Sequence, residues 1–367
     1  MTRTSLAWSA ALALTTGCGF QVNGGGTSID ATLEPDAPPD APPDAPPDGP
    51  PPTADCFGTS GLALVCLQSV PVAEFTFVVA TSIDTNTSPM CAVLQAGSSN
   101  VCVIAASALT ISAPVTVTGM RPLVLLSLTA MTINQPLDVA SHRGSPKGPG
   151  GDASACNAGV APTVSGGGQG GSFGSVGGNG GNSDGSTDRG TFGAITVPTT
   201  LRGGCIGAEG AGSPGSHGHG GGAVLMIADT ITISSIINAS GSPGAGAPAG
   251  KHGGGGAGSG GMIVFDAVTI TISGPVHANG GGGGGGSSGG GAASPGSEPP
   301  AVGGAAGGAK AGSGGMGGTG SMGAGTGQPA GSGTSSTDGG GGGGGGAGVI
   351  LQFRHVGALP MTSPPVP

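Results

Sequence analysis

The apolar and polar positions of this chain follow one pattern that recurs and predicts its strands. Residues Val224–Gly241 align without a gap with Ile263–Gly280, 39 residues later. The same window aligns with 124–141 and 102–119, and a partial fifth copy begins at Val349. Each copy holds three short runs in which successive residues alternate between two faces, as in β-strands. A single copy cannot bury its apolar face, so we expect the copies to stack.

The spacing of the copies predicts the fold. The shortest step between copies is 22 residues, about one coil of a repeat stack. Longer steps contain glycine-rich insertions at about 144–221, 242–260 and 281–346, each between the end of one copy and the start of the next. The prediction is an all-β fold: a short right-handed parallel β-helix (β-solenoid) with long glycine-rich insertions at one corner.

The alternation also predicts which side chains point inward. In the second run these are Leu109, Ile111, Met131, Ile133, Ile231, Ile233, Ile270 and Ile272. In the third run they are Val115, Val117, Leu137, Val139, Ile237, Ala239, Val276 and Ala278. In the first run we expect Val124, Leu126, Val224, Met226, Ile263, Phe265, Val349 and Leu351. The residues between them, Leu125, Leu225, Val264 and Ile350, are also apolar. We therefore expect a glycine-rich insertion or the N-terminal part of the domain to cover that outer face.

The N-terminus predicts export. Arg3 precedes an apolar segment, Leu6–Leu14, that is too short for a membrane-spanning helix. The following Gly17-Cys18 resembles the cleavage site of bacterial lipoprotein signals, although Thr15 stands where such signals usually carry Leu or Val. The resemblance implies a signal peptide at 1–17, lipidation of Cys18 and a membrane anchor. Gly19 in place of Asp favours the outer membrane or cell surface, and ordinary secretion is the alternative.

A stalk follows. Residues 36–52 repeat Asp and Pro with an Asp at every fourth position from Asp36 to Asp48. Proline at this density favours polyproline II, and 17 residues at roughly 3.1 Å each would reach about 50 Å. A threefold helix scatters carboxylates spaced by four around its axis, so a solvated spacer is favoured over a calcium site. We expect 18–55 to be a disordered, lipid-anchored stalk.

Six cysteines remain beyond Cys18, and an even number in an exported chain predicts disulfides. Proximity favours Cys56 with Cys66, Cys91 with Cys102, and Cys156 with Cys205, among fifteen possible connectivities. No C-x-x-C pair supports zinc. We expect 56–101 to form a disulfide-containing cap with the first strands, 102–359 to hold the coils, and 360–367 to be a disordered tail.

Composition excludes several functions. Of 367 residues 86 are glycine, 7% are charged and none is tyrosine. The net charge is −9, and nine scattered Lys and Arg form no basic patch, so nucleic acid is not an expected partner. We expect no cofactor and no metal site. His217 and His219 could bind a metal, but histidines of a flexible loop with no fixed role are the favoured interpretation.

No catalytic constellation is evident. The outward column of the third run holds Thr116, Asp138, Asn238 and His277. Asp138 and His277 would lie two coils apart, about 10 Å, too far for a direct hydrogen bond. Satisfied surface polar groups are the favoured interpretation. Enzymes that act on polysaccharides, lyases or hydrolases, also use β-helices, and such an activity is the alternative to a non-enzymatic role.

Outward threonines form a second pattern. They are Thr110, Thr132, Thr230, Thr232, Thr269 and Thr271, and T-x-T pairs on neighbouring coils are similar to those of ice-binding β-solenoids. Threonine is also simply a good strand residue. Binding to ice or another crystal surface is therefore a second alternative.

Signal, stalk and repeats together resemble the uncharacterised glycine-rich exported lipoproteins of myxobacteria, whose stalks precede β-helix (pectin-lyase-like) coils with glycine-rich loops. A more distant likeness is to the glycine-rich surface proteins of mycobacteria, whose N-terminal Pro-Glu domain this chain lacks. The resemblance implies location and fold. We expect a cell-surface lipoprotein with a structural, adhesive or interaction role and no catalytic activity, with surface polysaccharide or another envelope protein as partner. Whether the glycine-rich insertions form polyglycine II or are disordered is left open.

Overall fold

The computed structural model describes residues 55–59, 61–91, 100–184, 187–195, 197–322, 325–328 and 338–366. The predicted signal peptide, Cys18 and the Asp/Pro-rich stalk lie outside these residues. The strands are β1 (Asp55–Phe57), β2 (Val65–Leu67), β3 (Phe75–Phe77), β4 (Thr81–Asp84), β5 (Cys102–Ala106), β6 (Leu109–Ile111), β7 (Val115–Thr118), β8 (Leu123–Ser127), β9 (Ala130–Ile133), β10 (Leu137–Asp138), β11 (Ala223–Ile227), β12 (Thr230–Ile233), β13 (Ile237–Asn238), β14 (Met262–Asp266), β15 (Thr269–Ile272), β16 (Val276–His277), β17 (Val349–Phe353) and β18 (Thr362–Ser363), with one 3₁₀ helix, η1 (Pro89–Cys91).

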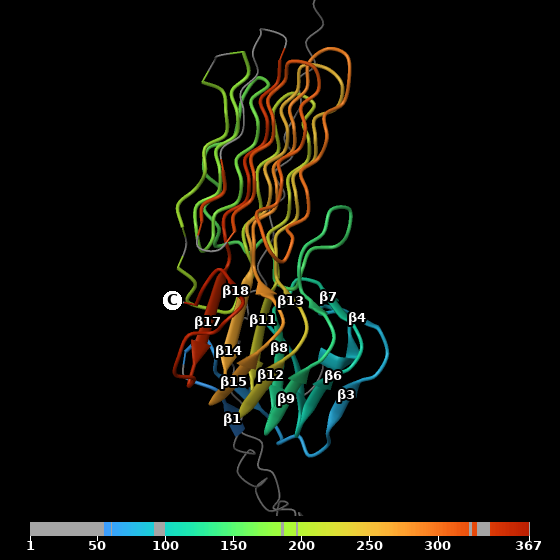
Figure 1. Ribbon diagram of the computed structural model, residues 1–367, viewed down its shortest axis with the longest axis vertical. Coiled ribbons are helices and arrows are strands. Elements are labelled where there is room, and N and C mark those ends of the chain that lie inside the picture. The colour runs from blue at the N-terminus through green and yellow to red at the C-terminus, as the bar shows by residue number, and fades with distance from the viewer. Residues whose placement is uncertain are drawn as a thin grey trace, which may run out of the picture. The chain divides into compact units, whose positions relative to one another are not determined.

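Three parallel sheets make up the body, and the predicted all-β class is confirmed (Figure 1). The first sheet is five-stranded, in the order β5-β8-β11-β14-β17. The second sheet is five-stranded, β3-β6-β9-β12-β15, and the third is six-stranded, β4-β7-β10-β13-β16-β18. From β3 to β17, strands that follow one another in the chain enter different sheets, and each third strand returns to the same sheet. Each copy of the sequence repeat therefore supplies one layer of a stack.

The predicted core of the second and third sheets is confirmed. Every inward residue expected from their alternation lies in one continuous cluster of buried side chains, which runs through the stack. Burial of this cluster, at roughly 25 cal/mol per Å² of apolar surface, is the main hydrophobic stabilisation of the stack.

In the first sheet, part of the predicted inward column is wrong. Val224, Met226, Ile263 and Phe265 do point inward. In β8, however, Leu123 and Leu125 are the inward residues, while Val124 and Leu126 belong to the outer cluster. In β17, Ile350 is inward, and Val349 and Leu351 pack against the outer cluster.

A one-residue difference at a corner explains the error in β8. Leu125 pairs with Met226 in the first sheet, and Met131 pairs with Ile231 in the second. Leu125 and Met131 are six positions apart, but Met226 and Ile231 are five apart. The corner after β8 therefore holds one residue more than the corner after β11. Because the strand period is two, a slip of one residue exchanges the faces. In β17, Ile350 pairs with Ile263, and a continuous apolar run gives no alternation to set that register.

The expected cover over the outer face of the first sheet is confirmed. Val124, Leu225 and Val264 are buried there beneath two other parts of the chain. One is the antiparallel hairpin of β1 and β2, with the segment between them, which contributes Ala63, Val65 and Leu67. The other is the first glycine-rich insertion, which contributes Phe173. Both sources named by the sequence prediction therefore supply the cover.

The stack extends further at both ends than the repeats indicate. Before the first repeat, β3 pairs with β6 and β4 with β7, which adds a partial layer. At the other end, the prediction of a disordered tail over 360–367 is wrong for the described residues. β18 pairs with β16, and Val366 packs against the core. Two polar strand residues carry no apolar alternation, so only the open edge of β16 explains why a strand forms there.

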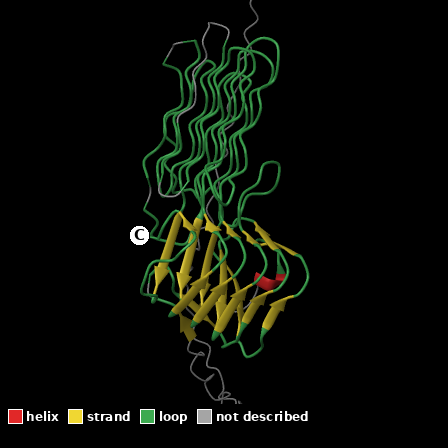
Figure 2. Ribbon diagram, in the orientation of Figure 1, coloured by secondary structure: helices red, strands yellow, loops and turns green. Residues whose placement is uncertain are grey.

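The long insertions leave the stack at one corner, as predicted. They lie between β10 and β11, between β13 and β14, and between β16 and β17 (Figure 1). Their described residues run as long extended lengths of chain, side by side and without regular β-strands (Figure 2). We call the described residues of 163–222, 241–261 and 280–348 the glycine bundle.

Hydrogen bonds join these lengths in several directions with a period of three residues. Segment 338–348 illustrates the pattern. Its amides at Gly340, Gly343 and Gly346 donate to the carbonyls of Ser165, Gly168 and Gly171 at 3.0, 2.8 and 2.9 Å. The residues just before them, Gly339, Gly342 and Gly345, donate to a different length at Ser287, Gly284 and Gly281. A third length donates to this segment from Gly254, Ala257 and Gly260. Three residues per turn is the period of polyglycine II, the ordered alternative that the sequence left open.

The close approach of these lengths explains their composition. A Cβ atom at Gly343 would lie 2.1 Å from the carbonyl oxygen of Gly178, and one at Gly342 would lie 1.9 Å from that of Gly255. No side chain fits at such positions. Backbone hydrogen bonds therefore hold this part of the fold together where apolar side chains are few.

Candidate interaction surfaces

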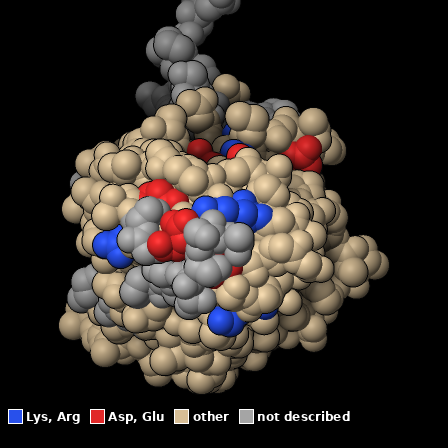
Figure 3. Space-filling model, turned by 90° about the horizontal axis from the view of Figure 1, so that it is seen from above, with Lys and Arg blue, Asp and Glu red and all other residues tan. Residues whose placement is uncertain are grey.

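The far end of the glycine bundle gathers polar side chains from several turns. We call Asp184, Ser213, Lys251, His252, Ser288, Ser313 and Asp338 the bundle tip. Antiparallel bridges join His252 to Ser287 and Ser288 to Asp338. Lys251 Nζ donates to Asp184 Oδ2 at 3.1 Å, and Ser313 Oγ donates to Asp338 Oδ1 at 2.7 Å. Figure 3, which views this end, shows Lys, Arg, Asp and Glu gathered on an otherwise uncharged surface.

The base of the tip is rigidly held. The amide of Ser213 donates to His252 Nδ1 at 2.9 Å, and Ser165 Oγ donates to the carbonyl of Lys251 at 2.9 Å. Turns that are far apart in the sequence are thus fixed against one another. Loops on a rigid scaffold are the usual place for binding groups, because their side chains vary without cost to the core.

The predicted outward threonines form two columns on the second sheet. In one, Thr110, Thr132, Thr232 and Thr271 are neighbours across adjacent strands, and Thr76 of β3 extends the column. In the other, Thr230 pairs with Thr269 and with Ala130. Thr76 could not be predicted from the repeats, because the layer that holds β3 and β4 has no described strand in the first sheet and does not align with any copy. Neighbouring hydroxyls in such a column repeat about every 4.8 Å.

The outward column of the third sheet separates its acid from its base, as expected. Asn238 of β13 lies between Asp138 of β10 and His277 of β16. The prediction of a satisfied surface group is wrong for His277, which is buried and whose Nδ1 has no hydrogen-bond partner among the described residues. Burial lowers the pKa of His277 to about 4, against a smaller opposing effect of the Asp138 charge.

His142, just after β10, joins the stack to the third insertion. Its Nε2 lies 2.8 Å from Asp138 Oδ2, and its Nδ1 lies 3.4 Å from Glu298 Oε2. Glu298 also accepts a hydrogen bond from the amide of Arg143 at 2.9 Å. Hydrogen bonds to the two carboxylates raise the pKa of His142 to about 10. The imidazolium therefore bridges two chain segments at neutral pH.

His217 and His219 are not the unattached loop histidines that the sequence favoured. His219 Nδ1 lies 2.7 Å from Asp152 Oδ2, and His217 Nδ1 lies 3.5 Å from Glu209 Oε1. The two rings pack edge to face with centroids 5.3 Å apart. Among the described residues, no group of three or more His, Cys, Asp or Glu side chains is arranged to hold a metal ion.

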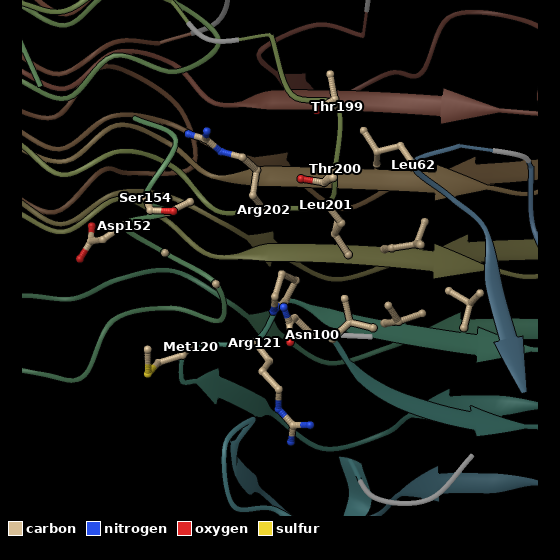
Figure 4. Close-up of a pocket in the computed structure, with 18 of the residues that line it drawn as sticks. Leu62, Asn100, Met120, Arg121, Asp152, Ser154, Thr199, Thr200, Leu201 and Arg202 are labelled. Atoms are coloured by element: carbon tan, nitrogen blue, oxygen red, sulfur yellow. The ribbon is translucent and has the colours of Figure 1, made fainter. Parts of the chain in front are cut away.

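A cavity of about 1050 Å³ lies beside the first sheet, between the N-terminal hairpin and the first insertion (Figure 4). Three cationic residues line it, but their charges do not converge. Arg121 Nε donates to the carbonyl of Thr85 at 2.6 Å, and Lys147 Nζ lies 3.8 Å from Asp152. Figure 4 shows the side chains of Arg121 and Arg202 extending in different directions.

Arg202 is engaged elsewhere. Its guanidinium lies over the ring of Phe173 at 4.7 Å, and its Nη2 is 3.0 Å from each sulfur of Cys156 and Cys205. Burial lowers the pKa of this guanidinium. The arginine therefore supports the base of the insertion, while its buried Nη1 has no hydrogen-bond partner among the described residues.

The cysteines pair as proximity in the sequence favours. Cys56–Cys66 joins β1 to β2, and Cys91–Cys102 joins η1 to β5. Cys156–Cys205 closes a loop in the first insertion. The disulfides therefore fasten the N-terminal hairpin, the segment before β5 and the first insertion.

The described residues include no helix long and apolar enough to cross a membrane. No protein-family model, no curated protein and no solved structure matches the chain. The resemblance to glycine-rich exported lipoproteins stays a prediction from the sequence.

Proposed function

We propose that this protein is a cell-surface lipoprotein that acts as a non-enzymatic adhesive or interaction module. In this proposal, lipidated Cys18 anchors the chain, the Asp/Pro-rich stalk spaces it from the membrane, and the bundle tip makes the contact. The stack is then a short right-handed parallel β-helix. Right-handedness follows from the general rule that about 98% of parallel crossover connections take that hand.

The observation that carries the proposal is the glycine bundle with its polar tip. Disordered insertions would present no fixed surface, but these lengths are hydrogen-bonded to one another along their course. A bundle of this kind holds Asp184, Lys251 and Asp338 in fixed relation. Mixed charges and hydroxyls suit a polar partner, such as surface polysaccharide or the outer part of an envelope protein.

The test is adhesion by cells that display the full chain. Lys251→Gln removes a charge from the tip, and Lys147→Gln removes the same charge from the base of the first insertion. The proposal predicts that the first variant lowers binding to envelope polysaccharide or to whole cells, and that the second binds like wild type. Equal binding by both variants would count against the tip. Loss of surface display in Cys18→Ala would test the anchor separately.

A second candidate function rests on the threonine column of the second sheet. Thr76 lengthens it to a continuous series of threonines that ends at Thr271. Such a regular array of hydroxyls fits a crystal surface, ice included. Thermal hysteresis that is lost in Thr132→Tyr, at the centre of the column, would support this function, and no freezing-point depression by wild type would exclude ice.

A further inference from the structure

Two histidines at the base of the glycine bundle are held in a way that the adhesive role does not use. His217 and His219 line a cavity of about 170 Å³ together with His142 and Arg143. They come from the returning part of the first insertion, while Ser242 and Pro243, which also line the cavity, come from the second. The cavity therefore lies where two insertions meet.

Each of the two imidazoles has a carboxylate beside the same ring nitrogen. His219 Nδ1 faces Asp152 at 2.7 Å, and Asp152 is itself fixed by the amide of Gly220, which donates to Oδ1 at 2.8 Å. His217 Nδ1 faces Glu209 at 3.5 Å. Among the described residues, the Nε2 atoms of both rings have no hydrogen-bond partner. A carboxylate on one ring nitrogen and a free second nitrogen is the usual arrangement of metal-binding histidines.

We propose that His217 and His219 together bind one first-row divalent cation, Cu²⁺ or Zn²⁺, through their Nε2 atoms, with water or a ligand oxygen in the remaining positions. Imidazole nitrogen suits both ions, and Cu²⁺ binds the more tightly in the general order of affinities. With metal–nitrogen bonds of about 2.0–2.1 Å, two imidazoles on one tetrahedral ion place their ring centroids roughly 5 Å apart. The observed separation of 5.3 Å matches that spacing.

His142 is not a third ligand in this site. Both of its nitrogens face carboxylates, Asp138 at 2.8 Å and Glu298 at 3.4 Å. Arg143 also lines the cavity, which makes an oxyanion the competing ligand. One observation favours the cation: the carboxylates of Glu209 and Asp152 lie beside the Nδ1 atoms of the two rings.

The experiment is calorimetric titration of the full chain with CuCl₂ or ZnCl₂ alone, with electron paramagnetic resonance of the Cu²⁺ form. The expected result is one ion per chain and nitrogen couplings from two imidazoles. His217→Ala and His219→Ala should each weaken binding at least 10-fold. Asp152→Asn and Glu209→Gln leave the ligands in place and should weaken binding by about 10- to 100-fold, the usual effect of such partners.

Two control variants make the result specific. His142→Gln changes the same cavity without removing a proposed ligand, and His355→Ala removes an exposed histidine beside Val268, at the end of the stack. Both should bind the ion as wild type does. Unchanged thermal melting without metal, in His217→Ala, would show that lost binding is not lost folding. No binding by wild type, loss of binding in His142→Gln, or binding of sulfate in place of the metals would each overturn the proposal.

Discussion

Substitution of one central glycine should weaken the whole bundle. Gly343 donates to Gly168 at 2.8 Å and accepts from Ala257 at 3.0 Å. In Gly343→Ala, the new Cβ would lie 2.1 Å from the Gly178 carbonyl oxygen, whereas an ordinary carbon–oxygen contact is about 3.3–3.6 Å. The length that holds Gly178 must move by more than about 1 Å. That is enough to break its two hydrogen bonds, from the Gly178 amide to the Gly344 carbonyl at 2.7 Å and from the Gly170 amide to the Gly178 carbonyl at 2.8 Å.

The size of the effect follows from those bonds. Each net hydrogen bond contributes about 1 kcal/mol, and each buried group left without a partner costs about 1–3 kcal/mol. Gly343→Ala should therefore lower the free energy of unfolding by roughly 2–4 kcal/mol. The matched control is Gly290→Ala, in an exposed turn where a Cβ meets nothing within 4 Å. That change should be neutral or stabilise by about 0.4–1 kcal/mol, because alanine restricts the unfolded chain.

The assay is urea denaturation of the full chain, followed by circular dichroism, with the two variants beside wild type. Equal stability of Gly343→Ala and Gly290→Ala would refute the close packing of the bundle. A loss of stability in both would show that a Cβ atom at Gly290 does meet other atoms.

Three further predictions concern titration and cross-linking. Burial lowers the pKa of His277 from 6.5 to about 4, so between these pH values the unfolded chain binds more protons than the folded chain. The free energy of unfolding should therefore drop by on the order of 3 kcal/mol as pH falls from about 6.5 to 4. His277→Asn should remove that drop in urea melts at pH 7, 5 and 4, and an unchanged profile would contradict it. The pKa of His142 is raised to about 10, so its contribution to the free energy of unfolding is fully present below pH 6.5 and is lost as pH rises toward 10. His142→Gln should therefore reduce the loss of stability between pH 6.5 and 10. A loss as steep as that of wild type would count against the ion pairs of His142 with Asp138 and Glu298. The double variant Cys156→Ser, Cys205→Ser opens a loop with a sequence separation of 49 and should lower the free energy of unfolding by about 4 kcal/mol in the chain-entropy model. The double variant Cys56→Ser, Cys66→Ser should lower it by about 3 kcal/mol. Thermal melts that rank the two variants in the opposite order would show that strain or residual structure, not loop entropy, dominates.

How far the sequence predicts the stack depends on the polarity of each run. In the second run, Ile231 and Ile233 alternate with threonine, and only one face can be buried, so the inward column is certain. In the first run, Leu123 to Leu126 are all apolar, because both faces are buried. Alternation then carries no information, and the structure alone gives the register.

The glycine bundle and the histidine site could not be predicted in the same way. The amide of Gly340 bonds to Ser165, far along the chain, and no local pattern in a run of glycines indicates which lengths become neighbours. His219 and Asp152 are 67 residues apart and meet only because the first insertion returns to its own base. The sequence shows the pair of histidines, but the carboxylates that orient them belong to the tertiary structure.

Amide hydrogen exchange of the glycines, resolved by NMR of the isotopically labelled full chain, tests the central claim most directly. The ordered bundle predicts that Gly340, Gly343 and Gly346 exchange as slowly as amides of the β-strands, while Gly289 in its exposed turn exchanges quickly. Exchange of all four amides at the rate of an unfolded peptide would contradict the bundle, and with it the fixed tip on which the proposed adhesion depends.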